Sequence, residues 1–392
     1  MSRRLRIAML TYSVKPRGGV VHALEVTEAL ARRGHHVELM ALARPGEELF
    51  RPAAVPLHVV RHVPPDSPFD ERVQSMLDAY ADGLRPILGA AAYDVVHSQD
   101  CLSANAALEL RAAGVIDHVI RTVHHVDDFT SPSLIECQDR SITEPDRVLC
   151  VSQPWVERLA DEFGRRAELV RNGVDTRRFR RARDACERDG DRARWGLGDR
   201  FAVLTVGGIE PRKGSLTLVE GLAMLRRLVP ERDAVLLVAG GTTLFDYRHE
   251  RERFDARAHE LGVAQHVRVL GAQAPEGIER LLRAADAFAF PSVKEGFGLA
   301  PLEALAAELP VVASDLDVFR SFLADGESAL LTPTGDAEAL ARALRRLAVD
   351  GALCARLRAG GRRAAREHTW AAAAAAHERA YEAFLATGAS VR

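Results

Sequence analysis

Short apolar runs alternate with helical patterns along almost the whole chain. Residues 6–12 and 36–42 have the composition of strands, and a helical pattern between them runs from about residue 20 to residue 33 and ends at Gly34. This order predicts a βαβ unit. Several strand runs are apolar at every position, which is typical of a parallel sheet whose two faces are both covered by helices. The chain is therefore predicted to be an α/β protein.

The alternation continues in two series that are separated by a charged stretch. The strand candidates of the first series are 57–63, 94–97, 119–124, 147–152 and 168–170, with helical segments near 70–89, 103–113 and 153–163. Those of the second series are 201–206, 234–239, 267–270, 287–290, 311–314 and 329–331. Residues 176–200 carry too many charged side chains to present an apolar face to a core, so the domain boundary is expected there. A chain of 392 residues is also longer than a single domain with one hydrophobic core usually is. We predict two doubly wound domains, 1–185 and 186–368, with ligands bound where the strands end.

The charge balance indicates which partners the chain does not need. The net charge is −2 although 28% of the residues are charged, so nothing favours nucleic acid as a partner. A basic run does occur, and its default interpretation is a solvated face, with an acidic acceptor or a membrane surface as the alternative. The run consists of Arg158, Arg165, Arg166, Arg171, Arg177, Arg178, Arg180, Arg181 and Arg183.

Cysteine usage and hydropathy bear on the compartment. The five cysteines are odd in number and never spaced as Cys-x-x-Cys, which argues against a disulfide framework and a zinc site. No apolar stretch approaches the roughly 18 residues that span a bilayer, and the basic N-terminus is predicted to be a first strand. We therefore expect a cytoplasmic protein, with peripheral contact at the inner face of the membrane left open.

Two carboxylates, Glu295 and Glu303, lie eight positions apart across a glycine-rich loop. Gly296 and Gly298 let backbone N–H groups approach an oxygen-rich ligand closely. Pro301 suits the first turn of a helix, so we predict Glu303 in that turn and the end of the helix at Pro310. A helix N-terminus attracts phosphate, and carboxylates accept hydrogen bonds from hydroxyls. The segment is therefore typical of a site for a nucleotide sugar.

Two further loops at predicted strand ends carry groups that suit phosphate. Arg212 and Lys213 follow the first strand of the second domain, and Ser215 is a plausible cap for the next helix. Gly18 and Gly19 follow the first strand of the chain and precede a helix, where bare N–H groups can receive phosphate. A tight turn without a ligand would use the same two glycines.

A histidine and two acidic pairs complete the set of polar candidates. His124 ends another strand of the first domain and can donate to a sugar hydroxyl or a phosphate oxygen. The acidic pairs, Asp127 with Asp128 and Asp315 with Asp317, allow a metal interpretation, but no further hard ligand stands at a helpful spacing. We therefore expect neither a metal nor another cofactor.

Taken together, these segments resemble the retaining, nucleotide-sugar-dependent glycosyltransferases of family 4, over nearly the whole chain. The most specific match is the Glu-x7-Glu pattern of Glu295 and Glu303; the others are Gly18-Gly19, Thr122 to His124, Asn172 to Asp175 and Glu210 to Gly214. The resemblance implies the GT-B fold, in which two Rossmann-like domains face each other across a cleft. It also implies that a last helix, about 369–388, crosses back to the first domain.

The resemblance implies a role for each matching residue. Glu303 would hold the nucleotide ribose, and Lys213 would meet the diphosphate together with Gly18 and Gly19. His124 would face the transferred sugar. Glu295 would grip that sugar with the backbone of Gly296, Phe297, Gly298 and Leu299. Many relatives carry an arginine where this chain has Gly208, and Arg212 is the candidate substitute.

The implied reaction moves a hexose from a UDP-, GDP- or ADP-linked donor to an acceptor hydroxyl, with retention and without a metal. Glu295, His124 and Lys213 would lie nearest to the reacting atoms. The acceptor is left open as a small molecule, a glycan or a lipid. Two alternatives stay open on the same architecture: a nucleotide-sugar epimerase, and a nucleotide-sugar binding protein without turnover.

Overall fold

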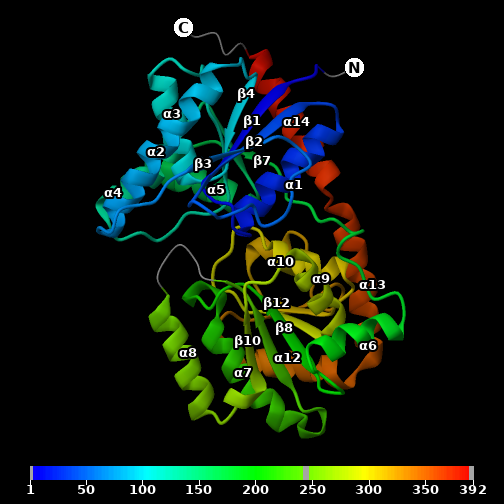
Figure 1. Ribbon diagram of the computed structural model, residues 1–392. Helices are drawn as coiled ribbons and strands as arrows, with labels where there is room; N and C mark the ends of the chain where they lie inside the picture. The colour runs from blue at the N-terminus through cyan, green and yellow to red at the C-terminus, as the bar shows by residue number, and fades with distance from the viewer. Residues whose placement is uncertain (1–2, 242–246, 388–392) are drawn as a thin grey trace. The chain divides into compact units, whose positions relative to one another are not determined.

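The computed structural model describes residues 3–241 and 247–387, and it is α/β throughout (Figure 1). The chain forms two compact units. Met1–Gly173 and Trp370–Arg392 make unit 1, and Val174–Thr369 makes unit 2. The chain therefore passes from unit 1 to unit 2 between Gly173 and Val174. The sequence analysis instead predicts this domain boundary at 185/186, where α6 begins.

Unit 1 is built on a parallel sheet of seven strands in the order β3-β2-β1-β4-β5-β6-β7. The strands are β1 (Arg6–Thr11), β2 (His36–Ala43), β3 (Leu57–Arg61), β4 (Val95–Ser98), β5 (Ile120–Val123), β6 (Arg147–Cys150) and β7 (Glu168–Leu169). The helices are α1 (Gly18–Arg32), α2 (Phe69–Gly89), α3 (Cys101–Ala112), α4 (Pro132–Thr143), α5 (Gln153–Phe163) and α14 (Trp370–Ala386). Helices α2 and α3 bury Tyr80, Leu84 and Leu108 against Leu10 and Met40 of the sheet, while α1 packs against α14.

Unit 2 is built on a parallel sheet of six strands in the order β10-β9-β8-β11-β12-β13. The strands are β8 (Ala202–Val206), β9 (Val235–Ala239), β10 (Val267–Gly271), β11 (Ala287–Phe290), β12 (Val311–Ser314) and β13 (Leu330–Thr332). The helices are α6 (Ala185–Arg194), α7 (Ser215–Leu228), α8 (Arg248–Glu260), α9 (Pro275–Ala284), α10 (Leu299–Ala306), α11 (Asp317–Arg320), α12 (Ala337–Val349) and α13 (Gly351–Glu367). Strand order reverses between β8 and β11, as it does between β1 and β4 in unit 1. Loops after these strands therefore meet at a topological switch point, the usual ligand position in such sheets.

Every predicted strand is present, and the doubly wound α/β prediction is confirmed for both units. Two helices were missed. One is α4, which follows β5 where no helix was predicted and buries only Leu134, Gln138, Ser141 and Ile142. The charged stretch up to residue 200 contains α6, which is held by ion pairs and not by an apolar stripe. Within it, Asp191 lies 2.6 Å from the Nε of Arg283. None of the helices in the described ranges combines the length and apolar composition of a membrane span.

The last helix, α14, returns to unit 1 as the resemblance implies, and it is held there by polar contacts as well as by packing. Arg33 Nε donates to Glu378 Oε2 at 2.7 Å, and the Tyr381 hydroxyl lies 2.7 Å from His97 Nδ1. The rings of His377 and His22 lie 5.5 Å apart, and both side chains are fully buried. Burial lowers the pKa of His377 to about 4 and that of His22 to about 3, so both rings are neutral at pH 7.

These buried histidines predict that unit 1 loses stability in acid. Below pH 6.5 the unfolded chain binds protons at His377 and His22 that the folded chain does not bind, so stability falls as the pH is lowered from about 6.5 to about 4. For His377 alone the loss by pH 4 is about 3 kcal/mol. Denaturant unfolding of the His377→Leu variant at pH 7 and pH 4 should show a shallower pH dependence than the wild type. His249→Gln is the control, because that side chain is 85% exposed; equal slopes for all three proteins would contradict the prediction.

Candidate active site

The glycine-rich loop after β11 enters α10 much as the sequence predicts, but the helix begins earlier. Gly298 is the cap residue with φ of 105°, and α10 starts at Leu299. Glu303 therefore lies in the second turn, and the prediction of the first turn is wrong. The helix also ends at Ala306, before Pro310. A β-carbon on Gly298 would come within 2.6 Å of the Phe319 ring, so only glycine allows this entry.

The loop after β8 places Arg212 and Lys213 in a short 3-10 turn, Pro211–Lys213. Gly214 ends this turn with φ of 66° and caps α7. Ser215 is the first residue of α7, so it does not cap the helix as predicted. Its hydroxyl instead donates to the carbonyl of Glu210 at 3.1 Å. The turn is also tied to the neighbouring loop, because Val293 N donates to the carbonyl of Arg212 at 2.8 Å.

Lys213 and Glu295 meet where these two loops converge. Lys213 Nζ lies 2.5 Å from Glu295 Oε1, and Arg212 Nη1 lies 3.7 Å from the same oxygen. Ser292 Oγ donates to that oxygen at 3.0 Å. Lys213 Nζ also lies 4.7 Å from the centre of the Phe290 ring, in cation–π range. The predicted cations and one predicted carboxylate thus form one cluster at the switch point between β8 and β11.

Burial and charge act against each other in this cluster. Burial alone would raise the pKa of the Glu295 carboxyl, but the Lys213 ammonium and the Arg212 guanidinium more than offset it, and the pKa lies below its usual value. Burial lowers the pKa of Lys213, and Arg212 adds to this effect while Glu295 opposes it. The cluster therefore brings two cations, Lys213 and Arg212, together with two carboxylates, Glu295 and Glu210, in a place of low solvent access, where each charge acts strongly on a ligand.

The remaining residues that were predicted to bind the sugar donor in unit 2 come after Glu295 in the chain. Phe297 is buried and stacks on Phe322 with ring centres 5.0 Å apart, so its side chain anchors the loop. What Phe297 offers to a ligand is its backbone. Gly296, which precedes it, and Leu299, the first residue of α10, are half-buried, and Glu303 lies half-buried one turn further along α10. The cap residue Gly298 has no side chain that could satisfy the first N–H groups of α10.

In unit 1 the structure brings Gly19 and His124 together. Gly18 and Gly19 are the first two residues of α1, so this helix starts two positions earlier than predicted. A β-carbon on Gly19 would lie 3.4 Å from His124 Cδ2 and 3.7 Å from the carbonyl oxygen of Gln99. Gly18 has no atom within 4 Å of its β-carbon position. Burial, with a smaller contribution from His22, lowers the pKa of His124 well below its usual value, so the ring is neutral.

The other charged candidates have local partners. Asp315 accepts from Arg320 at 2.6 Å, and Asp127 lies 3.2 Å from His125 Nε2. Several arginines of the basic run also form ion pairs: Arg158 with Glu162, Arg178 with Glu279, and both Arg180 and Arg183 with Glu187. Their guanidinium groups therefore form ion pairs within the protein itself.

Four residues of the two loop clusters were given no role from the sequence. Ser292 and Phe290 contact the Lys213–Glu295 pair, and Glu210 holds Arg212 with Oε2 2.9 Å from Nε. Gln99 contacts His124 in unit 1. The rule that ligand groups follow strand ends could have found Gln99, because it comes directly after β4. Ser292 and Glu210 stand beside predicted residues, but their contacts depend on loop conformation.

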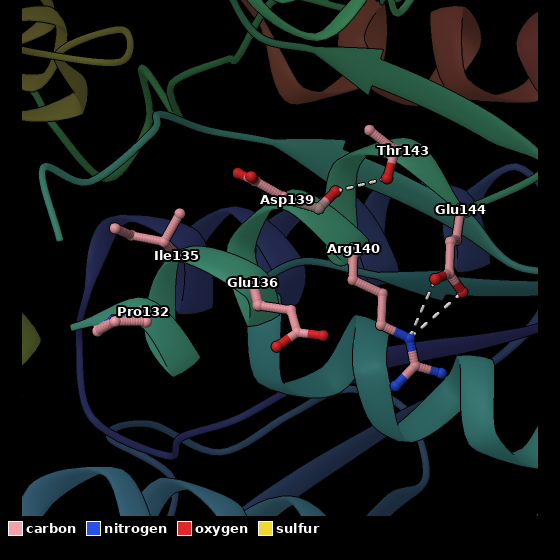
Figure 2. Close-up of a pocket in the computed structure, with 7 residues that line it drawn as sticks. All are labelled: Pro132, Ile135, Glu136, Asp139, Arg140, Thr143 and Glu144. Atoms are coloured by element: carbon pink, nitrogen blue, oxygen red, sulfur yellow. Dashed lines mark hydrogen bonds and ion pairs between the residues drawn. The ribbon is translucent and has the colours of Figure 1, made fainter. Parts of the chain in front are cut away.

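A separate hollow of about 530 Å³ lies along α4, lined by Pro132, Ile135, Glu136, Asp139, Arg140, Thr143 and Glu144 (Figure 2). It is shallow and shares no residue with either cluster. Arg140 Nε pairs with Glu144 Oε1 at 3.2 Å, which leaves Glu136 and Asp139 as an acidic lining. Such a lining repels phosphate, so we assign it no part in donor binding.

Comparison with known proteins identifies the family. Residues 16–178 match the family described as Glycosyltransferase Family 4, and residues 187–364 match Glycosyl transferases group 1. The phosphatidyl-myo-inositol mannosyltransferase of Mycobacterium leprae is 31% identical, over 99% of each chain. The D-inositol 3-phosphate glycosyltransferase of Salinispora tropica is 30% identical, over 93% of this chain and 82% of the relative.

Solved structures agree on the fold. The sucrose-phosphate synthase of Thermosynechococcus elongatus superposes with a TM-score of 0.82 at 23% identity, covering 98% of this chain and 100% of the other. Anabaena Alr3699/HepE, solved in complex with UDP-glucose, gives 0.77 at 18% identity, with 98% and 100% covered. The two Rossmann-like sheets, the two family matches and the relative that aligns over 99% of each chain lead to one conclusion: the chain belongs to the family 4 glycosyltransferases of the GT-B fold.

Proposed function

We propose that this glycosyltransferase moves a hexose from a nucleotide diphosphate sugar to an acceptor hydroxyl, with retention of configuration and without a bound metal. The observation that carries the proposal is the cluster of Lys213, Arg212 and Glu295 at the switch point of unit 2. A diphosphate needs concentrated positive charge, and a sugar needs a carboxylate that accepts from its hydroxyls. Both requirements are met within one cluster.

The donor would exchange contacts with this cluster. Lys213 and Arg212 share Glu295 Oε1, and a diphosphate would draw both cations towards its own oxygens. Glu295 would then turn its carboxylate to the sugar hydroxyls, with Ser292 still bound to it. The N-terminus of α10 adds uncapped N–H groups, and Glu303 is the proposed partner of the ribose hydroxyls.

The same charges would stabilise the transition state. Cleavage of the glycosidic bond leaves negative charge on the diphosphate, and two preorganised cations stabilise it without solvent reorganisation. This positive charge is the reason for proposing a metal-independent reaction. Retention would follow from attack on the face from which the diphosphate leaves, with a phosphate oxygen accepting the proton of the acceptor hydroxyl. In unit 1, Gly18, Gly19 and neutral His124 are proposed to meet the diphosphate and the sugar.

For the acceptor we propose an inositol phosphate. Two relatives that align along most of this chain are named for D-inositol 3-phosphate and phosphatidyl-myo-inositol, and a phosphorylated inositol is the chemistry that these names share. A free inositol phosphate and a lipid headgroup both carry it. The five cysteines are free thiols, which suits a reducing compartment, so we place the reaction in the cytoplasm.

The test is an assay of purified protein with UDP-, GDP- and ADP-hexoses against D-inositol 3-phosphate and against vesicles that contain phosphatidylinositol. We expect transfer from one donor in the presence of EDTA, and NMR of the product should show the anomeric configuration of the donor. Transfer in only one acceptor arm identifies the source of the headgroup. An epimerase would instead convert the donor without any acceptor, and a binding protein would protect the donor without any product.

Gly18 and Gly19 give a prediction that separates ligand approach from folding. Neither glycine has a positive φ, and the β-carbon of an alanine meets nothing at position 18 and only ordinary contact at position 19. The free energy of unfolding of Gly19→Ala should therefore lie within about 0.5 kcal/mol of the wild-type value. It should still lower kcat/KM for the donor by roughly tenfold, because the methyl group holds the phosphate away from the helix N-terminus. Gly18→Ala is the matched variant, because it adds the same methyl group at the neighbouring position. Unchanged kinetics in both variants would remove this loop from the donor site.

A further inference from the structure

A buried amide contacts the candidate sugar-facing histidine of unit 1. Gln99 follows β4 and is only 1% exposed. Its Oε1 lies 3.1 Å from His124 Nε2. Its Nε2 lies 3.0 Å from Met9 Sδ and 3.2 Å from His97 Nε2. One side chain therefore connects His124 to the interior of the sheet.

The sulfur of Met9 decides which way the amide points. A thioether sulfur can only accept a hydrogen bond, so the amide atom that faces it must be the nitrogen. The oxygen of Gln99 then faces His124, and an oxygen can only accept. The proton of the neutral His124 ring is therefore on Nε2, and Nδ1 carries the lone pair.

A second histidine, His97, supports this orientation of the Gln99 amide. Gln99 donates to His97 Nε2, so the proton of neutral His97 is on Nδ1, which lies 2.7 Å from the Tyr381 hydroxyl. The Thr122 hydroxyl also approaches His97 Nε2, at 2.8 Å. Burial lowers the pKa of His97 well below its usual value, which keeps this ring neutral. The hydrogen-bonded series thus runs from Tyr381 on α14 through His97 and Gln99 to His124.

We propose that Gln99 is a positioning residue that holds His124 as its Nε2–H tautomer, so that the Nδ1 lone pair accepts a hydroxyl of the transferred sugar. The Nε2 edge of the ring is occupied by Gln99 and faces Gly19, while the side chain as a whole stays partly exposed. The part of the proposal that concerns the sugar rests on the proposed function. The tautomer itself is a property of the ligand-free protein.

The test reads the tautomer directly. Protein labelled with ¹⁵N in its histidine rings is compared by NMR as wild type, Gln99→Leu and Gln99→Glu, with His124→Gln used only to assign the His124 signals. Protonated and lone-pair nitrogens resonate in separate regions. We expect Nε2–H in the wild type and in Gln99→Glu, which keeps an acceptor oxygen, and loss of this preference in Gln99→Leu. An Nδ1–H wild type, or no change in a folded Gln99→Leu, overturns the proposal.

Addition of the donor then tests the contact with the sugar. We expect the Nδ1 resonance of His124 to shift when the donor binds, and kcat to fall about tenfold in Gln99→Leu but less in Gln99→Glu, as expected for one lost hydrogen bond. If the donor binds and this resonance does not move, the assigned contact is wrong. If no donor binds any of the proteins, the proposed function has failed, and the tautomer result stands or falls by the ligand-free spectra.

Discussion

Lys213→Ala is expected to lower kcat/KM for the donor on the order of a hundredfold, which corresponds to about 3 kcal/mol of lost transition-state stabilisation. The ammonium lies 2.5 Å from Glu295 and 4.7 Å from the centre of the Phe290 ring, whereas the Arg212 guanidinium lies 3.7 Å from the same carboxylate oxygen. Steady-state kinetics with the active donor measures the effect. Lys294→Ala is the matched control, because it removes a lysine from the neighbouring loop to which our proposal assigns no contact with the diphosphate.

The same variant has a consequence for stability that must be separated from catalysis. Loss of the ammonium leaves the Glu295 carboxylate buried, with the Arg212 guanidinium still 3.7 Å away. A buried charge that loses its partner destabilises the folded protein. Kinetics should therefore be measured well below the unfolding temperature of the variant. A Lys213→Ala protein that is folded and turns over the donor at the wild-type rate would contradict the assignment of Lys213.

Gly214→Ala is expected to destabilise unit 2 by more than about 3 kcal/mol. Gly214 has φ of 66°, and its β-carbon would lie 2.0 Å from the carbonyl oxygen of Pro291, a backbone atom that has little freedom to move. The same contact joins the two loops that carry Lys213 and Glu295. Substitution should therefore disturb the cluster even where the protein still folds.

The control for this prediction is Gly326→Ala. Gly326 has φ of 72° but no atom within 4 Å of its β-carbon position, so it reports the conformational cost alone, about 1 kcal/mol. Denaturant unfolding of both variants measures the difference. Equal losses would mean that the approach of Gly214 to Pro291 is not a constraint.

Sequence patterns predicted the strands better than the helices, for physical reasons. Strands buried on both faces are apolar at every position, so 287–290 and 311–314 were located to the residue. Helix α6 buries Asp191 and Arg192 in ion pairs, and apolar periodicity cannot detect such a helix. The start of α10 was misplaced because Pro301 was taken as the signal, whereas the left-handed conformation of Gly298 sets the cap.

The residues of the candidate site could be named from the sequence, but the contacts between them could not. Strand ends and glycine loops indicated Lys213, Glu295 and His124 as separate candidates for ligand contact. The ion pair of Lys213 and Glu295 depends on β8 and β11 being neighbours, which no local pattern encodes. The thiols of Cys101 and Cys137 are a similar case, since they lie 2.8 Å apart although 36 positions separate them.

The central claim is that unit 2 binds a nucleotide diphosphate sugar through Lys213 and Glu303. Thermal unfolding with a panel of UDP-, GDP- and ADP-sugars tests it directly, because a ligand at a hundred times its dissociation constant adds roughly 2.7 kcal/mol. We predict that one donor stabilises the wild type and the Lys294→Ala control, and that neither Lys213→Ala nor Glu303→Ala responds. Stabilisation of those two variants as strong as that of the wild type, or no stabilisation of folded wild type by any donor, would contradict the account.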